Sequence, residues 1–277
     1  MGKRFLHNRA AVVTVAFVLL IALIGILAPL LAPHDPYVTD ILNKFAPYSL
    51  EYPLGTDHLG RCVLSRLIYG IRPTLGLALL TMLGTIALGA LLGVMAGYFR
   101  GVVEEVIMRV VDVMLSFPSQ IMVFAVVGLL GINVQNVIIA NVFIKWAWYA
   151  RMVRSLVISL RQREFVLASR LSGAGHVRVF VDHLAGAVIP SLLVLATLDI
   201  GHMMLHVAGM SFLGLGVTAP TAEWGVMIND ARQYIWTQPL QMFWPGLALF
   251  ISVMAFNLVG DALRDHLDPH LVTEHAH

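Results

Sequence analysis

Long apolar stretches dominate this sequence of 277 residues and restrict what it can fold into. Residues 10–33, 73–99, 113–144 and 239–260 contain no charged side chain, and a fifth apolar stretch runs from about residue 184 to residue 215. About 20 apolar residues are enough for a helix to cross a bilayer. Only 12% of the residues are charged, whereas a soluble domain carries roughly 25%. We therefore expect an all-α integral membrane protein.

The third stretch determines how many crossings we expect. It is 32 residues long and is interrupted by the polar run 131–136, so two crossings fit only if the second continues past Lys145. The sequence then predicts six transmembrane helices in a domain of residues 10–263, between a cytoplasmic amino terminus (1–9) and a cytoplasmic tail (264–277). This orientation places twelve Lys and Arg side chains inside and five outside, as the positive-inside rule requires.

One basic segment interrupts the apolar stretches. Residues 151–183 contain six arginines and the run Leu167-Ala168-Ser169-Arg170-Leu171-Ser172-Gly173, followed by Ala174 and Gly175. Small residues from 168 to 175 would give one helix a face onto which the groove of another protein could close. An ordinary amphipathic surface helix would explain the arginines but not this cluster of small residues.

The spacing of this run resembles the Glu-Ala-Ala-x-x-x-Gly coupling motif of bacterial ATP-binding-cassette importer permeases, with Leu167 at the position of the glutamate. The resemblance implies a cytoplasmic coupling loop at residues 151–186 that carries a coupling helix. The residues that it implies for ATPase coupling are Leu167, Ala168, Ser169, Gly173, Ala174, Gly175 and His183.

A second motif precedes the second apolar stretch. Gly55-Thr56-Asp57-His58-Leu59-Gly60-Arg61-Cys62 resembles the Gly-Thr-Asp-x-x-Gly-Arg-Asp signature of the dipeptide, oligopeptide and nickel importer subfamily, with Cys62 in place of the second aspartate. From about Trp146 onward the chain is most similar to second permease subunits of nickel importers. The cargo implied is nickel or a nickel chelate, and the alternative is a di- or oligopeptide.

The resemblance also implies partners in a bacterial inner membrane. These are a second homologous permease subunit, two ATP-binding-cassette subunits, an extracytoplasmic substrate-binding protein and membrane lipid. The chain has no Gly-x-x-x-x-Gly-Lys-Ser/Thr phosphate loop, so ATP and Mg²⁺ are expected on the partner subunits. We expect a non-catalytic subunit that binds no cofactor of its own, and the absence of a basic patch with interleaved aromatics argues against nucleic acid.

Polar groups inside apolar stretches are costly unless paired or functional. Asp199, His202 and His206 share one helix face, and imidazole is a suitable nickel ligand, so the two histidines are candidate transient metal ligands on a substrate path. Hydrogen bonding to neighbouring helices is the simpler interpretation, because the spacing identifies no third or fourth ligand. Lys145 could line the path or reach the membrane interface. An ATPase-independent metal channel would also explain such groups.

Overall fold

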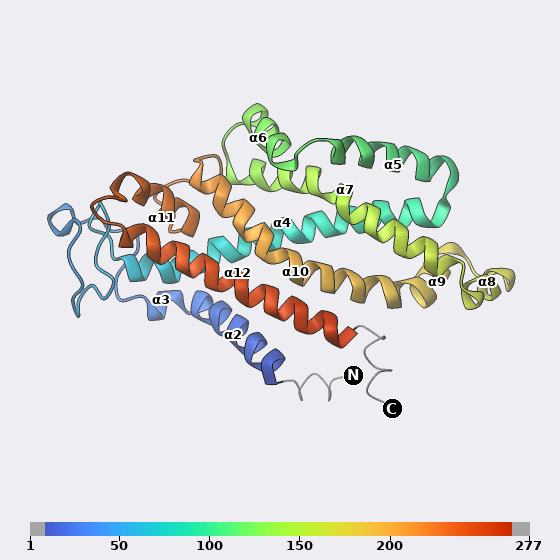
Figure 1. Ribbon diagram of the computed structural model, residues 1–277, viewed down its shortest axis with the longest axis horizontal. Coiled ribbons are helices and arrows are strands. Elements are labelled where there is room, and N and C mark those ends of the chain that lie inside the picture. Colours follow the sequence, from blue (N-terminus) through green and yellow to red (C-terminus); the bar gives the residue numbers. More distant parts are fainter. Residues whose placement is uncertain (1–8, 268–277) are drawn as a thin grey trace. The chain divides into compact units, whose positions relative to one another are not determined.

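The computed structural model describes residues 9–267, and the regular elements of this part are helices (Figure 1). The longer ones are α2 (Arg9–Ile26), α4 (Val63–Phe99), α5 (Gly101–Ser116), α6 (Ser119–Leu130), α7 (Val134–Arg161), α10 (Ala185–Phe212) and α12 (Leu240–Leu267). The shorter ones are α3 (Ala28–Leu31), η1 (Ile41–Asn43), α8 (Glu164–Leu171), α9 (His176–Val179), the π-helical turn η2 (Phe180–Leu184), α11 (Trp224–Ala231) and η3 (Arg232–Tyr234). The expected all-α class is confirmed for these residues. The predicted cytoplasmic termini, residues 1–9 and 264–277, lie mostly outside the described residues.

Three helical segments of the described residues are long and apolar enough to cross a membrane: Val63–Phe99, His176–Phe212 and Leu240–Asp265. A fourth candidate is the pair α5 and α6, which is bent by 94°. The bend lies at Pro118, because a proline disfavours helical geometry at the residue before it and Phe117 is extended, with ψ of 148°. The sequence predicted a crossing from residue 113, but the structure has this bend instead. Six crossings remain a prediction.

The helices form two compact units. The terminal unit consists of Met1–Leu80, Gly131–Val137 and Thr197–His277, and the central unit consists of Thr81–Leu130 and Ile138–Ala196. Each is described separately below.

In the terminal unit, α2 packs against α12, and α11 packs against α12 as well (Figure 1). The carboxyl end of α2 is closed by Arg72, whose Nε and Nη2 donate to the carbonyls of Gly25 and Ile26, each at 2.6 Å. Carbonyls at the end of a helix have no partner within the helix. The Arg72 side chain therefore satisfies two of the carbonyls at the end of α2.

Helix α4 begins ten residues earlier than the sequence predicted. We expected its apolar span to start at Pro73, but Pro73 lies inside the helix, which begins at Val63. The intervening arginine Arg66 is only 1% exposed and lies among acidic partners. Because paired charges can be buried, Arg66 did not prevent the helix from forming.

In the central unit, α4 and α7 approach closely along a row of glycines on α4. A Cβ atom at Gly89 would lie 2.5 Å from Cβ of Tyr149, and one at Gly93 would lie 2.6 Å from the Ala150 carbonyl oxygen. Gly84 and Gly97 continue the row, because a Cβ atom there would lie 2.8 Å from Val142 and 2.9 Å from the Arg154 carbonyl oxygen. Small residues of this kind allow membrane helices to pack backbone against backbone.

Candidate functional site

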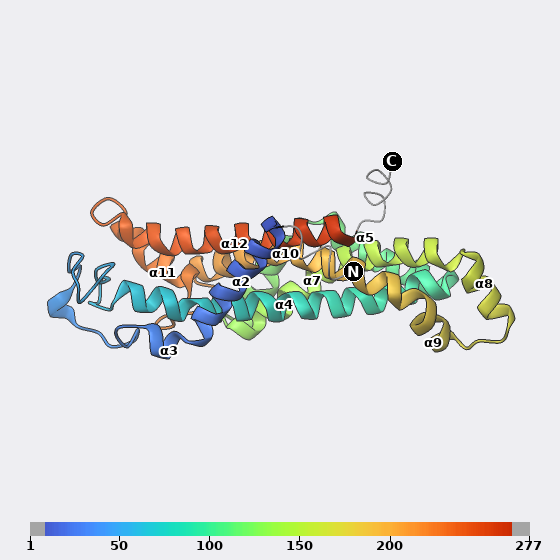
Figure 2. The same cartoon turned by 90° about the horizontal axis from the view of Figure 1, so that it is seen from below.

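The loop between α7 and α10, residues 162–184, is called the α8 loop here. Helix α8 ends at Leu171, and Gly173 follows in the left-handed region with φ of +83°. The amide N–H of Gly173 donates to the Arg170 carbonyl at 3.0 Å, and that of Ala174 donates to the Ser169 carbonyl at 3.2 Å. This turn separates α8 from α9, and Figure 2 shows α8 following α7 and α9 leading into α10.

The turn corrects one expectation about this loop. The small residues from 168 to 175 do not share one helix, because a left-handed residue ends an α-helix. Ala168 and Ser169 lie on α8, whereas Gly173, Ala174 and Gly175 form the connection to α9. Gly173 itself forms the turn between the two helices.

Helix α8 instead presents apolar side chains to its surroundings. Leu171 is 91% exposed, and Phe165 and Leu167 are about half exposed. Ala168 is also exposed, whereas Val166 is completely buried. His183, on η2, contacts the start of α8, with its ring 5.7 Å from that of Phe165. An exposed apolar face rimmed by polar residues is typical of a binding surface.

The opposite side of the α8 loop rests on a closed apolar cluster. Val166 and Val179 from the loop pack with Tyr98, Val153 and Val157 from α4 and α7. The Tyr98 hydroxyl also lies 2.9 Å from Nδ1 of His176. This role of Tyr98 could not be predicted from the sequence, because an aromatic residue at the end of an apolar stretch is ordinary at a membrane interface.

Asp199, His202 and His206 lie on α10, as predicted. Nδ1 of His202 is 3.5 Å from Oδ1 of Asp199, and the His202 side chain is 67% exposed. His206 is partly buried. Within residues 9–267 no three metal-ligating side chains gather into a group that could hold an ion. Lys145 is partly buried on α7, in the central unit.

The terminal unit contains an ion cluster that the sequence only partly indicated. Oδ2 of Asp57 lies 2.6 Å from Nε of Arg61 and 3.6 Å from Nε of Arg66. Oδ2 of Asp230, on α11, lies 3.3 Å from Nη2 of Arg61 and 3.7 Å from Nη2 of Arg66. Both arginine side chains are 1% exposed. These four residues, the Asp57 cluster, join the signature loop to α11, 169 residues away in sequence.

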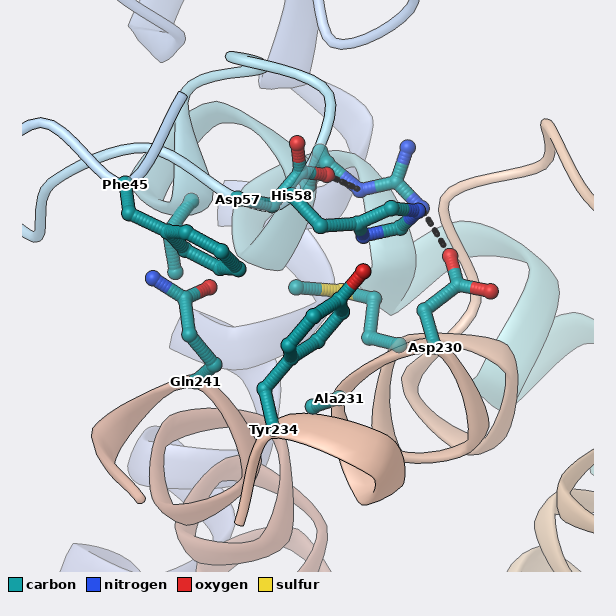
Figure 3. A pocket seen from close by; sticks show the side chains of 10 residues that line it. Phe45, Asp57, His58, Asp230, Ala231, Tyr234 and Gln241 are labelled. Atoms are coloured by element: carbon teal, nitrogen blue, oxygen red, sulfur yellow. Dashed lines mark ion pairs between the residues drawn. The ribbon is translucent and has the colours of Figure 1, made fainter. Parts of the chain in front are cut away.

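Next to the Asp57 cluster lies a small hollow lined by rings (Figure 3). The rings of His58 and Tyr234 stack at 5.7 Å, and Gln241 donates from Nε2 to the Thr56 carbonyl at 2.7 Å. Burial lowers the pKa of the His58 imidazole, which keeps it neutral beside two arginines. Gly60 has φ of +77°, and a Cβ there would overlap the Asp40 carbonyl. Gly60 is therefore required by its backbone conformation and by the nearby Asp40 carbonyl. Asp57 is required by its contacts with the two arginines.

Glu223 provides a second buried link to α11. It is completely buried and caps the amino end of α11, where Oε2 accepts the Val226 amide at 3.0 Å. Oε1 accepts the Thr74 hydroxyl at 3.1 Å. Burial raises the pKa of Glu223. The link to Thr74 could not be predicted from the sequence. An acid before a short helix is a common cap and does not indicate a second, distant partner.

Two family models match the chain. The model described as binding-protein-dependent transport system inner membrane component matches residues 89–273. The model described as the N-terminal TM domain of oligopeptide transport permease C matches residues 1–48. Residues 49–88 lie between the two matched ranges.

Curated relatives cover almost the full chain. The nickel transport system permease protein NikC of Escherichia coli is 67% identical over 99% of both chains. The metal-staphylopine import system permease protein CntC of Staphylococcus aureus is 40% identical over 97% of this chain and 93% of its own. The dipeptide transport system permease protein DppC of Alkalihalophilus pseudofirmus is 37% identical, covering 96% of this chain and 88% of its own.

Proposed function

The chain belongs to the family of binding-protein-dependent transport system inner membrane components, and from that premise we propose that it is a membrane-spanning subunit of an ATP-driven importer of nickel or a nickel chelate. It is a multi-pass inner-membrane protein. Its relatives named for nickel and for a metal-staphylopine complex support a metal cargo, free or chelated.

The proposed assembly follows the family. A second homologous permease subunit completes the pathway, a binding protein delivers the cargo from outside, and two ATP-binding-cassette subunits hydrolyse ATP with Mg²⁺ inside. In this arrangement the chain crosses the membrane six times with both termini in the cytoplasm, and the α8 loop faces the ATPases. The excess of Lys and Arg in the loops assigned to the cytoplasm supports this orientation.

The observation that carries the proposal is the exposed apolar face of α8. Leu167 and Leu171 are one helical turn apart and both exposed, while Val166 holds the helix to the protein beneath. A short helix with one seated face and one free apolar face suits insertion into a groove of another protein. We assign this contact to Leu167, Ala168 and Ser169 on α8, with Gly173, Ala174 and Gly175 forming the turn and His183 supporting Phe165.

Transport then follows from two arrangements of the complex. Nucleotide binding draws the ATPase subunits together and displaces α8, and the spans connected to it open the pathway to the other side. ATP must bind more tightly to one arrangement of the complex than to the other. A nucleotide with equal affinity for both would not shift the equilibrium between them. Lys145, Asp199, His202 and His206 are proposed to line the path, with the two histidines touching the metal only in passing.

A di- or oligopeptide is the second candidate cargo, because the peptide permease relatives are also about as similar as the metal-chelate one. A strain that lacks only this chain separates the two. Restoring the chain should restore the activity of a nickel-dependent enzyme in nickel-limited medium. Restored growth on di- or oligopeptides, with nickel-dependent activity unchanged, would transfer the cargo assignment to peptides.

An ATPase-independent metal channel differs in its energy source. If the chain formed such a channel, nickel would enter cells whose partner ATPase genes are deleted. The proposal requires that this deletion stops uptake as completely as deletion of the chain itself.

A further inference from the structure

Tyr98 connects the end of α4 to the α8 loop through its hydroxyl. It is the second-last residue of α4 and is only 6% exposed. Its hydroxyl lies 2.9 Å from Nδ1 of His176, the first residue of α9, and the two rings meet edge to face at 83°. The contact joins residues 78 positions apart.

Two arginines hold Tyr98 from other sides. Nη1 of Arg161, the last residue of α7, donates to the Tyr98 carbonyl at 2.7 Å. The guanidinium carbons of Arg161 and Arg170 each lie 5.9 Å from the Tyr98 ring centroid, within the range of cation–π attraction. Arg170 belongs to the last turn of α8. Tyr98 is therefore joined to the residues that bracket α8 on both sides.

These directional contacts differ from the apolar packing that lies beneath the loop. Val166 and Val179 hold the loop to α4 and α7 by burial, and hydrophobic burial has no preferred direction. A hydrogen bond weakens steeply when its angle is lost. A loop held only by apolar contacts could slide on its seat when pushed, whereas the Tyr98 contacts resist such sliding.

We propose that Tyr98, with His176 and Arg161, positions the α8 loop against the end of α4, so that a push on α8 moves α4 instead of being absorbed by the loop. The inference rests on the proposed function, in which ATPase subunits push α8. It assigns Tyr98, His176 and Arg161 as positioning residues for coupling, with no contact to cargo or nucleotide.

The test uses the complete complex, with both permeases, the ATPases and the binding protein, in proteoliposomes. Tyr98→Phe removes the hydroxyl and keeps the ring for the two arginines. Nickel transported per ATP hydrolysed should fall about fivefold, the factor that corresponds to the ~1 kcal/mol of one hydrogen bond, while ATP hydrolysis stays within about twofold. Tyr69→Phe is the matched control, because Tyr69 lies on the same helix with Arg72 over its ring, and it should transport as the unmodified complex does.

Further variants separate coupling from folding. His176→Leu should lower transport per ATP as Tyr98→Phe does, and the double variant should be no worse than either single one, because both remove the same bond. His176→Gln keeps a side chain that can donate and accept a hydrogen bond. Its transport per ATP should therefore be closer to that of the unmodified complex than that of His176→Leu.

Two results would overturn the inference. One is a Tyr98→Phe complex that transports as much nickel per ATP as the unmodified complex. The other is a Tyr69→Phe complex that loses as much transport per ATP as the Tyr98→Phe complex does. An unmodified complex that shows no ATP-driven uptake at all would contradict the proposed function itself, which keeps the two failures distinct.

Discussion

Gly173 ends α8 with φ of +83°, in open space where no atom lies within 4 Å of a Cβ placed there. Substitution at this residue is therefore limited by backbone strain and not by a clash. A side chain other than Asn or Asp costs roughly 1–2 kcal/mol in this conformation. Substitutions at Gly173 therefore test the backbone geometry of the turn and do not disturb packed side chains.

We predict that Gly173→Glu abolishes ATP-driven nickel uptake while the chain still inserts and assembles. The glutamate adds backbone strain and a negative charge beside the proposed ATPase contact. Gly173→Asn should keep at least about half of the uptake, because Asn tolerates the left-handed region. Uptake in membrane vesicles and co-purification with the ATPases measure the two effects. Full uptake by Gly173→Glu would remove α8 from the coupling role.

We predict that changing His202 and His206 together to alanine lowers nickel uptake several-fold and leaves the amount of assembled complex within about 20%. His202 lies 3.5 Å from Asp199, and two imidazoles on one helix can contact a passing cation but are too few to retain it. Leu205→Ala, at an exposed position of the same helix, serves as the control. Uptake by the double variant equal to that of the control would assign both histidines to packing.

Residues differ in how well the sequence revealed them. Gly173 was predictable because its role depends on a local spacing. Tyr98, Glu223 and Asp230 were not, because each acts on a partner far along the chain: His176, Thr74 and Arg61. Only the folded chain brings these partners together, although an acid such as Asp230 in an apolar protein is a signal that a partner must exist.

Among the elements, α4 and α7 approach each other closely along a row of glycines. Gly93→Ala would place a methyl group 2.6 Å from the Ala150 carbonyl oxygen. We predict that this change destabilises the protein by about 1–3 kcal/mol, as overpacking does. Gly76→Ala, on the same helix where nothing lies within 4 Å, should be neutral. Apparent melting temperatures in detergent measure both, and equal values would contradict the packing assigned to this glycine row.

The link between the signature loop and α11 depends on buried charges. We predict that Asp230→Ala lowers the stability of the protein by about 3 kcal/mol, because it removes one acid from two arginines that are 1% exposed. Proteolysis within residues 34–62 should become faster. Asp261→Ala, at an exposed position of α12, is the control. Equal cleavage rates for the two variants would show that the Asp57 cluster does not stabilise the segment of residues 34–62.

Element boundaries were harder to predict than element type. The length of the apolar stretches indicated helices, but the start of α4 depends on partners for Arg66 that lie outside the local sequence. The bend between α5 and α6 was in principle readable from Pro118. It was missed because the apolar run continues without a break across the proline.

At the scale of the whole molecule, composition and the two signature runs predicted the membrane class and the family, and the comparisons agree with both. These features can be recognised without knowledge of single contacts, because they are spread over the full chain. The number of crossings and their orientation depend on the bilayer and on partner subunits. Neither follows from the helices of one chain alone.

The central claim is that ATP hydrolysed by partner subunits drives nickel through this chain. Radioactive nickel uptake into proteoliposomes tests it most directly, with the full complex, the binding protein outside and ATP supplied to the ATPases. The account predicts accumulation against a gradient that stops when the ATPases are replaced by hydrolysis-deficient variants. Accumulation that continues with those variants, or with this chain alone, would contradict it.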